Sequence, residues 1–433
     1  MKEKQNWLIW LILLITLIRV GTYTVLEIGN TIFWWVLEFA IIMIFAILAY
    51  KSPNENTAAK AKPVKYFLIW NFICILRGFF VASNYWEFKN LVGTGFMLFI
   101  PLVVYILDDT LFLQNLIRRW FKYMPILFIF LIPYTFGTEH GADLYGKYFI
   151  PVLFLLPFIM LLSPKYRYYL LFLTIVVLFF SLDARSNIIR FIFALIIGLS
   201  YYCRRSISIK LLRITGFTFY LLPIILLSLG IFGMFNIFKM NEYIEGDYES
   251  TTNINGKSKS SSLTADTRTF LYEEVLQSAV KHEYVLFGRT PARGYDSEYF
   301  RKMVSKDLKM NTKERFGSEV AVHNIFTWNG LIGVVLYFLV FIKASLLALY
   351  KSKSYLMKLL GVFVAFRWTY AFVEDFTTFE LQYLFLWVTI GMCYSTKFRR
   401  MTDLEIKIWV NGIFDKRYRK LAYFNNKRKL HGI

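Results

Sequence analysis

The sequence predicts an all-α integral membrane protein that crosses the bilayer many times. Of its 433 residues 57% are hydrophobic, and the mean hydropathy is +0.47, which is far above that of a soluble domain. The apolar residues form continuous runs of roughly 15–25 residues instead of alternating with polar ones, and such runs are typical of membrane-spanning helices rather than strands. One polar stretch, from Lys239 to Val322, interrupts this pattern.

Twelve apolar runs qualify as candidate spans. Several are short for a hydrocarbon layer of about 30 Å, so we expect the helices to extend beyond some of these limits. The predicted spans are 7–26, 31–50, 66–83, 92–107, 123–137, 148–163, 169–182, 187–203, 214–238, 324–342, 355–373 and 379–396.

The distribution of Lys and Arg predicts how these spans are oriented. One alternate set of connections, which includes both termini, holds 29 of these residues, whereas the opposite set of short connections holds 4. Because cytoplasmic connections are enriched in Lys and Arg, both termini are predicted to be cytoplasmic. The polar stretch then lies outside the membrane, and its 13 basic and 13 acidic residues balance.

Four regions follow from this topology. They are spans one to nine (1–238), a large extracytoplasmic loop (239–322), spans ten to twelve (323–396) and a basic cytoplasmic tail (397–433). The net charge of +21 comes mainly from cytoplasmic connections and the tail, which suit an anionic leaflet, so nucleic-acid binding is not expected. The three cysteines lie in or beside spans, which disfavours a disulfide framework or a thiolate metal site.

Five arginines are predicted near the outer leaflet. Arg19, Arg77, Arg190 and Arg367 fall in the outer halves of spans, and Arg185 lies in the short turn between spans seven and eight. A buried charge is costly in a membrane, so each of these arginines is expected to have an anionic partner, a bound ligand or access to the interface. One interpretation is an anionic lipid-linked ligand, because a guanidinium matches phosphate oxygens. The alternative is that these arginines reach the interface or pair with the carboxylates of Glu38, Glu374 and Asp375.

Within the loop, residues 240–263 are polar and rich in Ser and Asn, which is typical of a flexible segment. An amphipathic helix is predicted from Asp266, and it places Arg268 on its apolar face. In its first turn, Arg268 adds to the attraction of a helix N-terminus for phosphate, although a structural ion pair is an open alternative. A glycine-bracketed turn follows with Arg289 and Arg293, and a basic surface turn explains it equally well.

His323 and Asn324 open the tenth span at the outer surface, followed by Gly330 and Gly333. A helix N-terminus favours the neutral imidazole, which can take a proton from a hydroxyl group. A purely structural histidine is the alternative. No two histidines have the spacing of metal ligands, so a metal site is not expected.

Taken together, these pieces resemble the O-antigen ligase/polymerase family of bacterial membrane glycosyltransferases. The resemblance covers roughly residues 165–395. It consists of Arg185 in its turn, Arg268 at the loop helix, the turn from Leu286-Phe287-Gly288 to Gly294, and His323-Asn324 followed by two glycines. It implies a GT-C-like fold of about twelve helices with the large loop between helices nine and ten. It also implies the bacterial cytoplasmic membrane as the location.

The resemblance further implies a metal-independent, inverting transfer of a glycan from undecaprenyl diphosphate to an acceptor hydroxyl, without a cofactor. The acceptor is lipid A core for a ligase and a lipid-linked glycan for a polymerase. Arg185 and Arg268 are then expected to bind the diphosphate, and His323 to deprotonate or orient the acceptor. The run Asp183-Ala184-Arg185-Ser186 departs from the family pattern, so Arg190 is a rival to Arg185. The further substrate-binding candidates are Arg77, Arg289, Arg293, Asn324 and Arg367.

Three rivals remain at this level. A flippase for lipid-linked oligosaccharides has a similar number of spans, but does not need a structured outer loop. A metal-dependent glycosyltransferase requires an acidic motif in the first outer loop, where only Glu27 is present, and Glu374-Asp375 is the nearest substitute. A scaffold subunit of an envelope assembly is the third. The sequence does not separate ligase from polymerase.

Overall fold

The computed structural model describes most of the chain as helices. The described residues are 2–17, 20–26, 28–51, 55–135, 141–182, 184–239, 242–243, 249–254, 257–262, 268–301 and 314–421. This helical content fits the predicted all-α class, with four short strands in addition.

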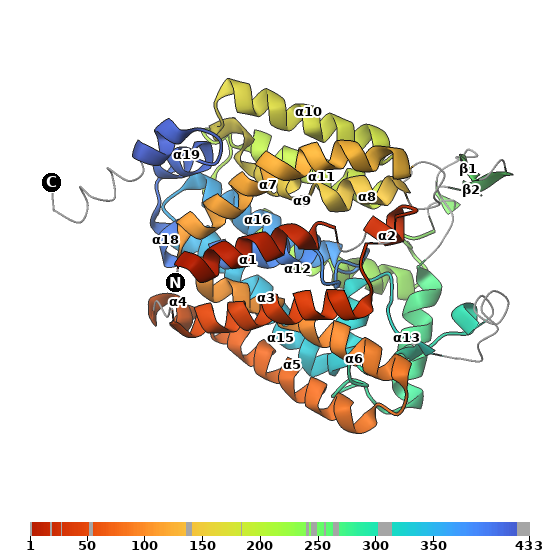
Figure 1. Cartoon of the computed structure of the whole chain (residues 1–433). Coiled ribbons are helices and arrows are strands. Elements are labelled where there is room, and N and C mark those ends of the chain that lie inside the picture. The colour runs from red at the N-terminus through yellow and green to blue at the C-terminus, as the bar shows by residue number, and fades with distance from the viewer. Residues whose placement is uncertain are drawn as a thin grey trace.

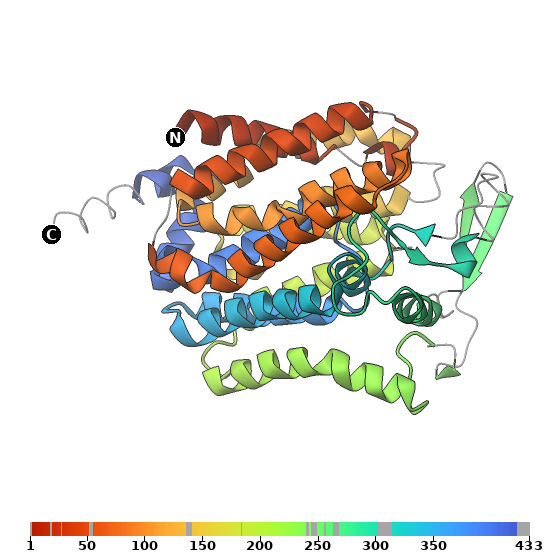
Figure 2. The same ribbon diagram turned by 90° about the horizontal axis from the view of Figure 1, so that it is seen from below.

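The first part of the chain forms a run of helices that pass back and forth along one axis (Figures 1 and 2). Prolines at helix starts and 3-10 turns divide several of these segments, because proline lacks the N–H that an α-helix needs. The elements are α1 (Lys2–Ile15), α2 (Val20–Tyr23), α3 (Thr31–Lys51), α4 (Glu55–Lys60), α5 (Lys62–Val81), α6 (Tyr85–Leu98), η1 (Ile100–Ile106), α7 (Thr110–Leu131), η2 (Ile132–Thr135), α8 (Gly141–Tyr148), α9 (Ile150–Leu155) and η3 (Leu156–Leu161).

The second part adds the polar loop and closes the bundle. Helix α13 runs across one end of the bundle, which we call the loop end, and α19 lies at the opposite end, the tail end, where α1 also begins (Figures 1 and 2). The elements are α10 (Pro164–Phe180), α11 (Arg185–Ser200), α12 (Ile209–Ile231), β1 (Glu249–Ile254), β2 (Lys257–Ser262), α13 (Thr269–Lys281), β3 (Tyr295–Asp296), β4 (Glu314–Arg315), α15 (Ala321–Lys351), α16 (Tyr355–Tyr370), α17 (Leu381–Tyr394), α18 (Thr396–Arg400) and α19 (Asp403–Asn411).

Each of the twelve predicted spans overlaps helical residues, but fewer helices meet the requirements of a span alone. Among the described residues, five helices are long and apolar enough to cross a membrane, and a sixth is added if α8 and the bent α9–η3 segment count as one. The rest are shorter or carry more charge; α17, for example, has 14 residues. The structure therefore supports a membrane protein with several spans, and the number twelve stays a prediction.

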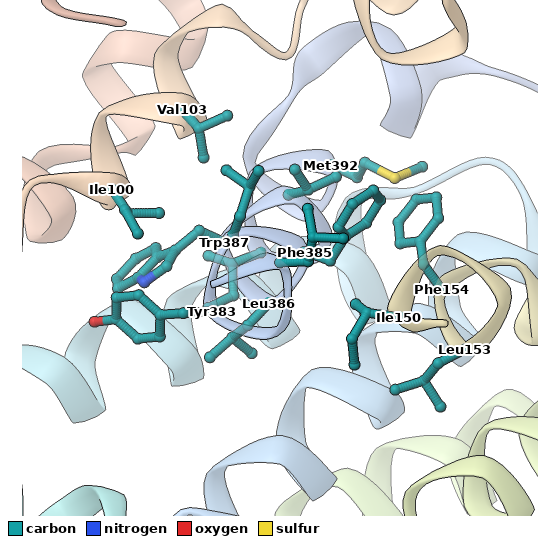
Figure 3. Packing of buried hydrophobic residues seen from close by; sticks show 14 of the residues in the cluster. Ile100, Val103, Ile150, Leu153, Phe154, Tyr383, Phe385, Leu386, Trp387 and Met392 are labelled. Atoms are coloured by element: carbon teal, nitrogen blue, oxygen red, sulfur yellow. The ribbon is translucent and has the colours of Figure 1, made fainter. Parts of the chain in front are cut away.

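Helix α17 lies at the centre of the apolar core. All of its residues from Leu381 to Tyr394 are buried. Figure 3 shows side chains of η1 and of α9 converging on it from opposite sides, with Ile100 and Val103 on one and Phe154 on the other. A short helix of this kind is shielded by its neighbours, so its side chains are packed against protein rather than lipid.

The polar loop contains more regular structure than its sequence predicts. In the segment expected to be flexible, β1 and β2 pair as an antiparallel hairpin in which Glu249 lies opposite Ser262. Further along, β3 pairs with β4. The predicted helix is present as α13, but it begins later, and Arg268 occupies the N-cap position. The expected N-cap, Asp266, lies outside the described residues.

The loop is joined to the bundle through a break in α15. At Gly330 the backbone leaves the helical conformation (φ 67°), and the segment 285–290 lies against the break. The freed carbonyls of Thr327 and Trp328 accept hydrogen bonds from Arg289 N at 2.6 Å and Thr290 N at 3.2 Å. The N–H groups of Leu331 and Ile332, which lose their helical acceptors, donate to the carbonyls of Val285 and Leu286. All four backbone groups are thus satisfied, as a membrane interior demands.

Two glycines make this contact possible. A Cβ on Gly288 would lie 2.4 Å from the backbone nitrogen of Gly330, and a Cβ on Gly330 would lie 2.3 Å from the carbonyl oxygen of Leu286. Both glycines also have positive φ, which other residues adopt with strain. Helix α5 braces the contact, because Arg77 donates to the carbonyls of Phe287 (2.7 Å) and Gly288 (3.3 Å).

We predict that Gly288→Ala and Gly330→Ala each separate the loop from α15. Positive φ alone costs about 1–2 kcal/mol, and the overpacking adds about 1–3 kcal/mol. Gly233→Ala is the matched control, since Gly233 has positive φ (68°) but nothing within 4 Å of its Cβ position. The measurement is thermal unfolding in detergent together with proteolytic cleavage of the loop. Equal loss of stability in all three variants would contradict the importance of the close approach.

Candidate functional site

His323 lies in the first turn of α15 and is buried, at 4% exposure. Its Nδ1 is 3.2 Å from Ser318 Oγ, and the ring of Tyr272 from α13 meets the imidazole edge-on at 4.1 Å between centroids. If Nδ1–H donates to Ser318, the lone pair is on Nε2, which is the atom that can accept a proton. Nε2 is buried and has no hydrogen-bond partner among the described residues.

The start of α15 is fixed to the connection between α16 and α17. The N–H groups of Ala321 and Val322 donate to the carbonyls of Glu374 (3.2 Å) and Ala371 (3.0 Å). These are first-turn N–H groups that have no partner within their own helix. The backbone beside His323 is therefore held at a set distance from the acidic pair Glu374-Asp375.

Arg268 lies at the N-cap of α13, close to His323. Its Nη2 forms an ion pair with Glu374 Oε2 at 2.9 Å. The neighbouring Tyr272 donates from its hydroxyl to the carbonyl of Phe372 at 2.5 Å, and its ring covers His323. Arg268 thus forms the ion pair that was the alternative to ligand binding, and Tyr272, one turn further along α13, contacts His323.

Glu374 is the carboxylate that four of the predicted arginines share. It interacts electrostatically with Arg185, Arg190, Arg268 and Arg367. Burial raises the pKa of Glu374, although the positive charges of Arg268 and Arg190 act in the opposite direction. We call these four arginines and Glu374 the arginine cluster. It contains more positive than negative charge, which favours an anionic ligand.

Two members of the arginine cluster are almost completely buried. Arg190, at 1% exposure, donates to the carbonyl of Ser186 and to Asn187 Oδ1, but its Nη1 has no hydrogen-bond partner among the described residues. Arg367 lies over the rings of Phe376 (4.6 Å) and Tyr370 (5.3 Å). Such contacts compensate a buried guanidinium in part, and an unsatisfied N–H remains available to a ligand.

The other three predicted binding arginines have partners that tie the loop together. Arg289 bonds to Asp296 (3.3 Å) and Glu314 (2.9 Å). Arg293 also bonds to Glu314 and approaches Glu87 of α6 at 3.7 Å. Arg77, as described above, holds the turn at Gly288. The structure brings none of these three into the arginine cluster, and their contacts explain their positions without a ligand.

Asn324 is likewise occupied by contacts within the protein. Its Oδ1 accepts from Ser318 N at 2.6 Å, and its Nδ2 donates to the carbonyl of Ser318 and to Asp375 Oδ1 at 3.1 Å. Thr377 adds further hydrogen bonds to Asp375. The pair 323–324 therefore faces two ways, with His323 towards α13 and Asn324 towards Asp375.

Sequence reasoning missed one large feature. A cleft of about 790 Å³ lies between the first turns of α3, α6 and α15 at the loop end, and it includes Asn324 and Asp375 in its lining. The tryptophans that line it come from elements far apart in sequence. The one signal in the sequence is that they lie near helix ends, where Trp is common in membrane proteins for other reasons.

Within the part of the chain that the structure describes, no group of three or more His, Cys, Asp or Glu side chains is placed to hold a metal ion. No protein-family model, curated protein or solved structure matches the chain.

We predict a pH-dependent contribution of Asp296 to the stability of the loop. Burial raises its pKa, but hydrogen bonds from Lys281 and His282 and the charges of His282 and Arg289 outweigh this and lower it to about 2. The contribution is therefore present above about pH 4 and disappears as the pH falls through 2.

Asp296→Asn should lower the melting temperature by about 1–3 °C at pH 7 and by progressively less between pH 4 and 2. The measurement is tryptophan fluorescence on heating, and Glu298→Gln on the exposed side of the loop serves as the control. A difference from the wild type that stays constant down to pH 2 would contradict the prediction.

Proposed function

We propose that the protein transfers a glycan from undecaprenyl diphosphate to an acceptor hydroxyl on the outer face of the bacterial cytoplasmic membrane. It acts as a polymerase or a ligase of O-antigen or a related surface polysaccharide. The observation that carries this proposal is the gathering of Arg185, Arg190, Arg268 and Arg367 around Glu374, beside the imidazole of His323.

The arrangement suits the leaving group. A diphosphate carries several negative charges, and guanidinium groups held in place match its oxygens by bidentate hydrogen bonds. Side chains from α11, from the N-cap of α13 and from α16 all contribute, so the cluster exists only in the folded bundle. Cations that are already oriented stabilise the charge that develops as the carrier leaves.

The reaction that we propose is a single displacement. The acceptor oxygen forms a bond to the anomeric carbon, and the bond from that carbon to the diphosphate oxygen breaks. The bonding electrons leave with the diphosphate, while Nε2 of His323 takes the acceptor proton. Attack from the face opposite the leaving group inverts the anomeric configuration. The reaction as written balances its bonds, electrons and proton without a metal or cofactor.

Access to His323 requires a movement. In the structure the Tyr272 ring covers the imidazole, so the reacting groups must displace α13 or turn this ring. The contacts to be broken include the hydrogen bond from the Tyr272 hydroxyl to the carbonyl of Phe372 and the Arg268–Glu374 pair. A diphosphate that competes with Glu374 for Arg268 would loosen the second of these. Once the substrates are bound, the return of α13 over His323 would exclude water from the glycosyl transfer.

The membrane arrangement belongs to the same proposal. We propose twelve spans with both termini in the cytoplasm, which places α13 and the arginine cluster at the outer leaflet. In support, α1 begins and α19 ends at the tail end, opposite α13 (Figure 1). The donor's apolar chain then lies in the bilayer while its phosphates are at headgroup depth. Lipid A core or a second lipid-linked glycan is the proposed acceptor.

We predict that His323→Ala and Arg268→Ala each reduce glycan transfer by about 10²–10³-fold. His282→Ala and Arg301→Ala are the matched controls, because both residues belong to the loop but lie outside the arginine cluster. The measurement is polymer length on gels together with the amount and sidedness of carrier-linked glycan in cells. Variant protein must be present in the membrane at the wild-type level.

The outcomes separate the rival functions. Loss of transfer with carrier-linked glycan accumulating at the outer face is the expected result. Accumulation only at the cytoplasmic face would favour the flippase, and normal glycan in both variants would refute the site. In a deletion strain, single repeats attached to the acceptor indicate a polymerase, whereas long chains that stay on the carrier indicate a ligase.

A further inference from the structure

The cleft at the loop end has a composition that differs from the rest of the molecule. Four tryptophans line it: Trp34 and Trp35 from α3, Trp86 from α6 and Trp328 from α15. Trp328 is 3% exposed, and its Nε1–H has no hydrogen-bond partner among the described residues.

Polar side chains are interspersed with these rings. Asn90, Thr94 and Lys89 from α6 and the carboxyl groups of Glu38 and Asp375 also line the cleft. Flat apolar faces next to amide, hydroxyl and carboxylate groups suit a saccharide, because a sugar ring has apolar C–H faces and a rim of hydroxyl groups that donate and accept.

Two dipeptides, 323–324 and 374–375, contact both the cleft and the residues of the α13 side. His323 faces Tyr272 of α13, whereas Asn324 and Trp328, four residues apart on one face of α15, face the cleft. In the same way Glu374 pairs with Arg268, whereas Asp375 bonds to Asn324 and lines the cleft. The hydrogen bond from Ala321 N to the carbonyl of Glu374 holds the two dipeptides side by side.

We propose that this cleft binds the saccharide of the acceptor. The assignment rests on the proposed function, which puts the carrier diphosphate at the arginine cluster. Asn324, which lines the cleft, is next to His323, the proposed base for the acceptor hydroxyl. The cleft's volume of about 790 Å³ is large enough for a saccharide of a few sugar rings. The four tryptophans therefore select and orient the acceptor chain.

Tryptophans near helix ends also have a simpler explanation, since they are enriched where a membrane meets water. That explanation applies to single rings that point into lipid headgroups. It does not account for the grouping of four rings with two carboxyl groups around one volume, or for the burial of Trp328. The two explanations predict different results with a soluble saccharide. Tryptophans that serve only as interface anchors predict no binding, whereas a saccharide cleft predicts binding that depends on them.

The test uses the full chain in nanodiscs and saturation-transfer NMR. The probe is the mixture of oligosaccharides that mild acid releases from the surface polysaccharide of the source cells. Trp35→Ala and Trp86→Ala should weaken binding by about tenfold or more. Trp86 is 48% exposed, so its replacement does not endanger folding. Trp7→Ala is the matched control, since Trp7 is 62% exposed and lies outside the cleft. Equal saccharide signals in the wild type and all three variants, or no signal at all, would overturn the proposal.

A second arm assigns the saccharide to acceptor or donor. With carrier-linked donor at saturation, Trp86→Ala should raise the KM for the acceptor about tenfold and leave kcat nearly unchanged. A rise in the KM for the donor instead would overturn the acceptor assignment.

The two proposals fail in different ways. Saccharide binding that depends on Trp35 and Trp86 without any transfer from a carrier would refute the glycosyltransferase and leave a saccharide-binding cleft. Transfer that depends on His323 but is indifferent to both tryptophans would refute the cleft alone. Arg268→Ala should reduce transfer by about 10²–10³-fold while it leaves the saccharide signal intact, because Arg268 pairs with Glu374 and does not line the cleft.

Discussion

The backbone hydrogen bonds that satisfy the break in α15 are the constraint on which the site depends. A helix that breaks at Gly330 exposes two carbonyl and two N–H groups, and in a membrane protein these groups need partners from the protein itself. The segment 285–290 supplies all four. The same segment continues from α13, so the pairing that repairs α15 also fixes where Arg268 and Tyr272 lie against its first turn. Loop and bundle are therefore one unit at this point.

This attachment explains why some arginines hold the loop in place and others do not. Arg77, Arg289 and Arg293 bond to carbonyl groups or to Glu314, and they hold the attached segment in place. The arginine cluster, in contrast, shares the single carboxylate of Glu374. Burying a guanidinium without a full set of partners is costly, and evolution retains such groups mainly where they serve a ligand. The unpartnered Nη1 of Arg190 is the clearest instance among the described residues.

The sequence allowed us to locate most helical segments and to select some of the arginines that lie near Glu374. Apolar runs located helical segments, but run length does not reveal whether a helix such as α17 faces lipid or protein. Charge in the outer halves of spans pointed to Arg190 and Arg367, because a cation there needs an explanation wherever it packs. The same argument also selected Arg77, which serves a backbone turn. The position of an arginine in the sequence does not show whether its guanidinium bonds to a backbone carbonyl or is available to bind an anion. The tryptophan cleft was missed because its residues meet only in three dimensions.

The geometry also bears on transport as an alternative. A flippase must move a charged headgroup across the whole membrane, so it requires polar groups along the entire path. Here the buried Arg190 and Arg367 lie near Glu374 at the loop end, while Leu381–Tyr394 at the centre of the bundle is apolar and closely packed. Moving a diphosphate past that helix would expose it to a medium that stabilises charge poorly. A cationic group beside a covered imidazole, with a saccharide-sized cleft behind it, instead suits chemistry that occurs in place.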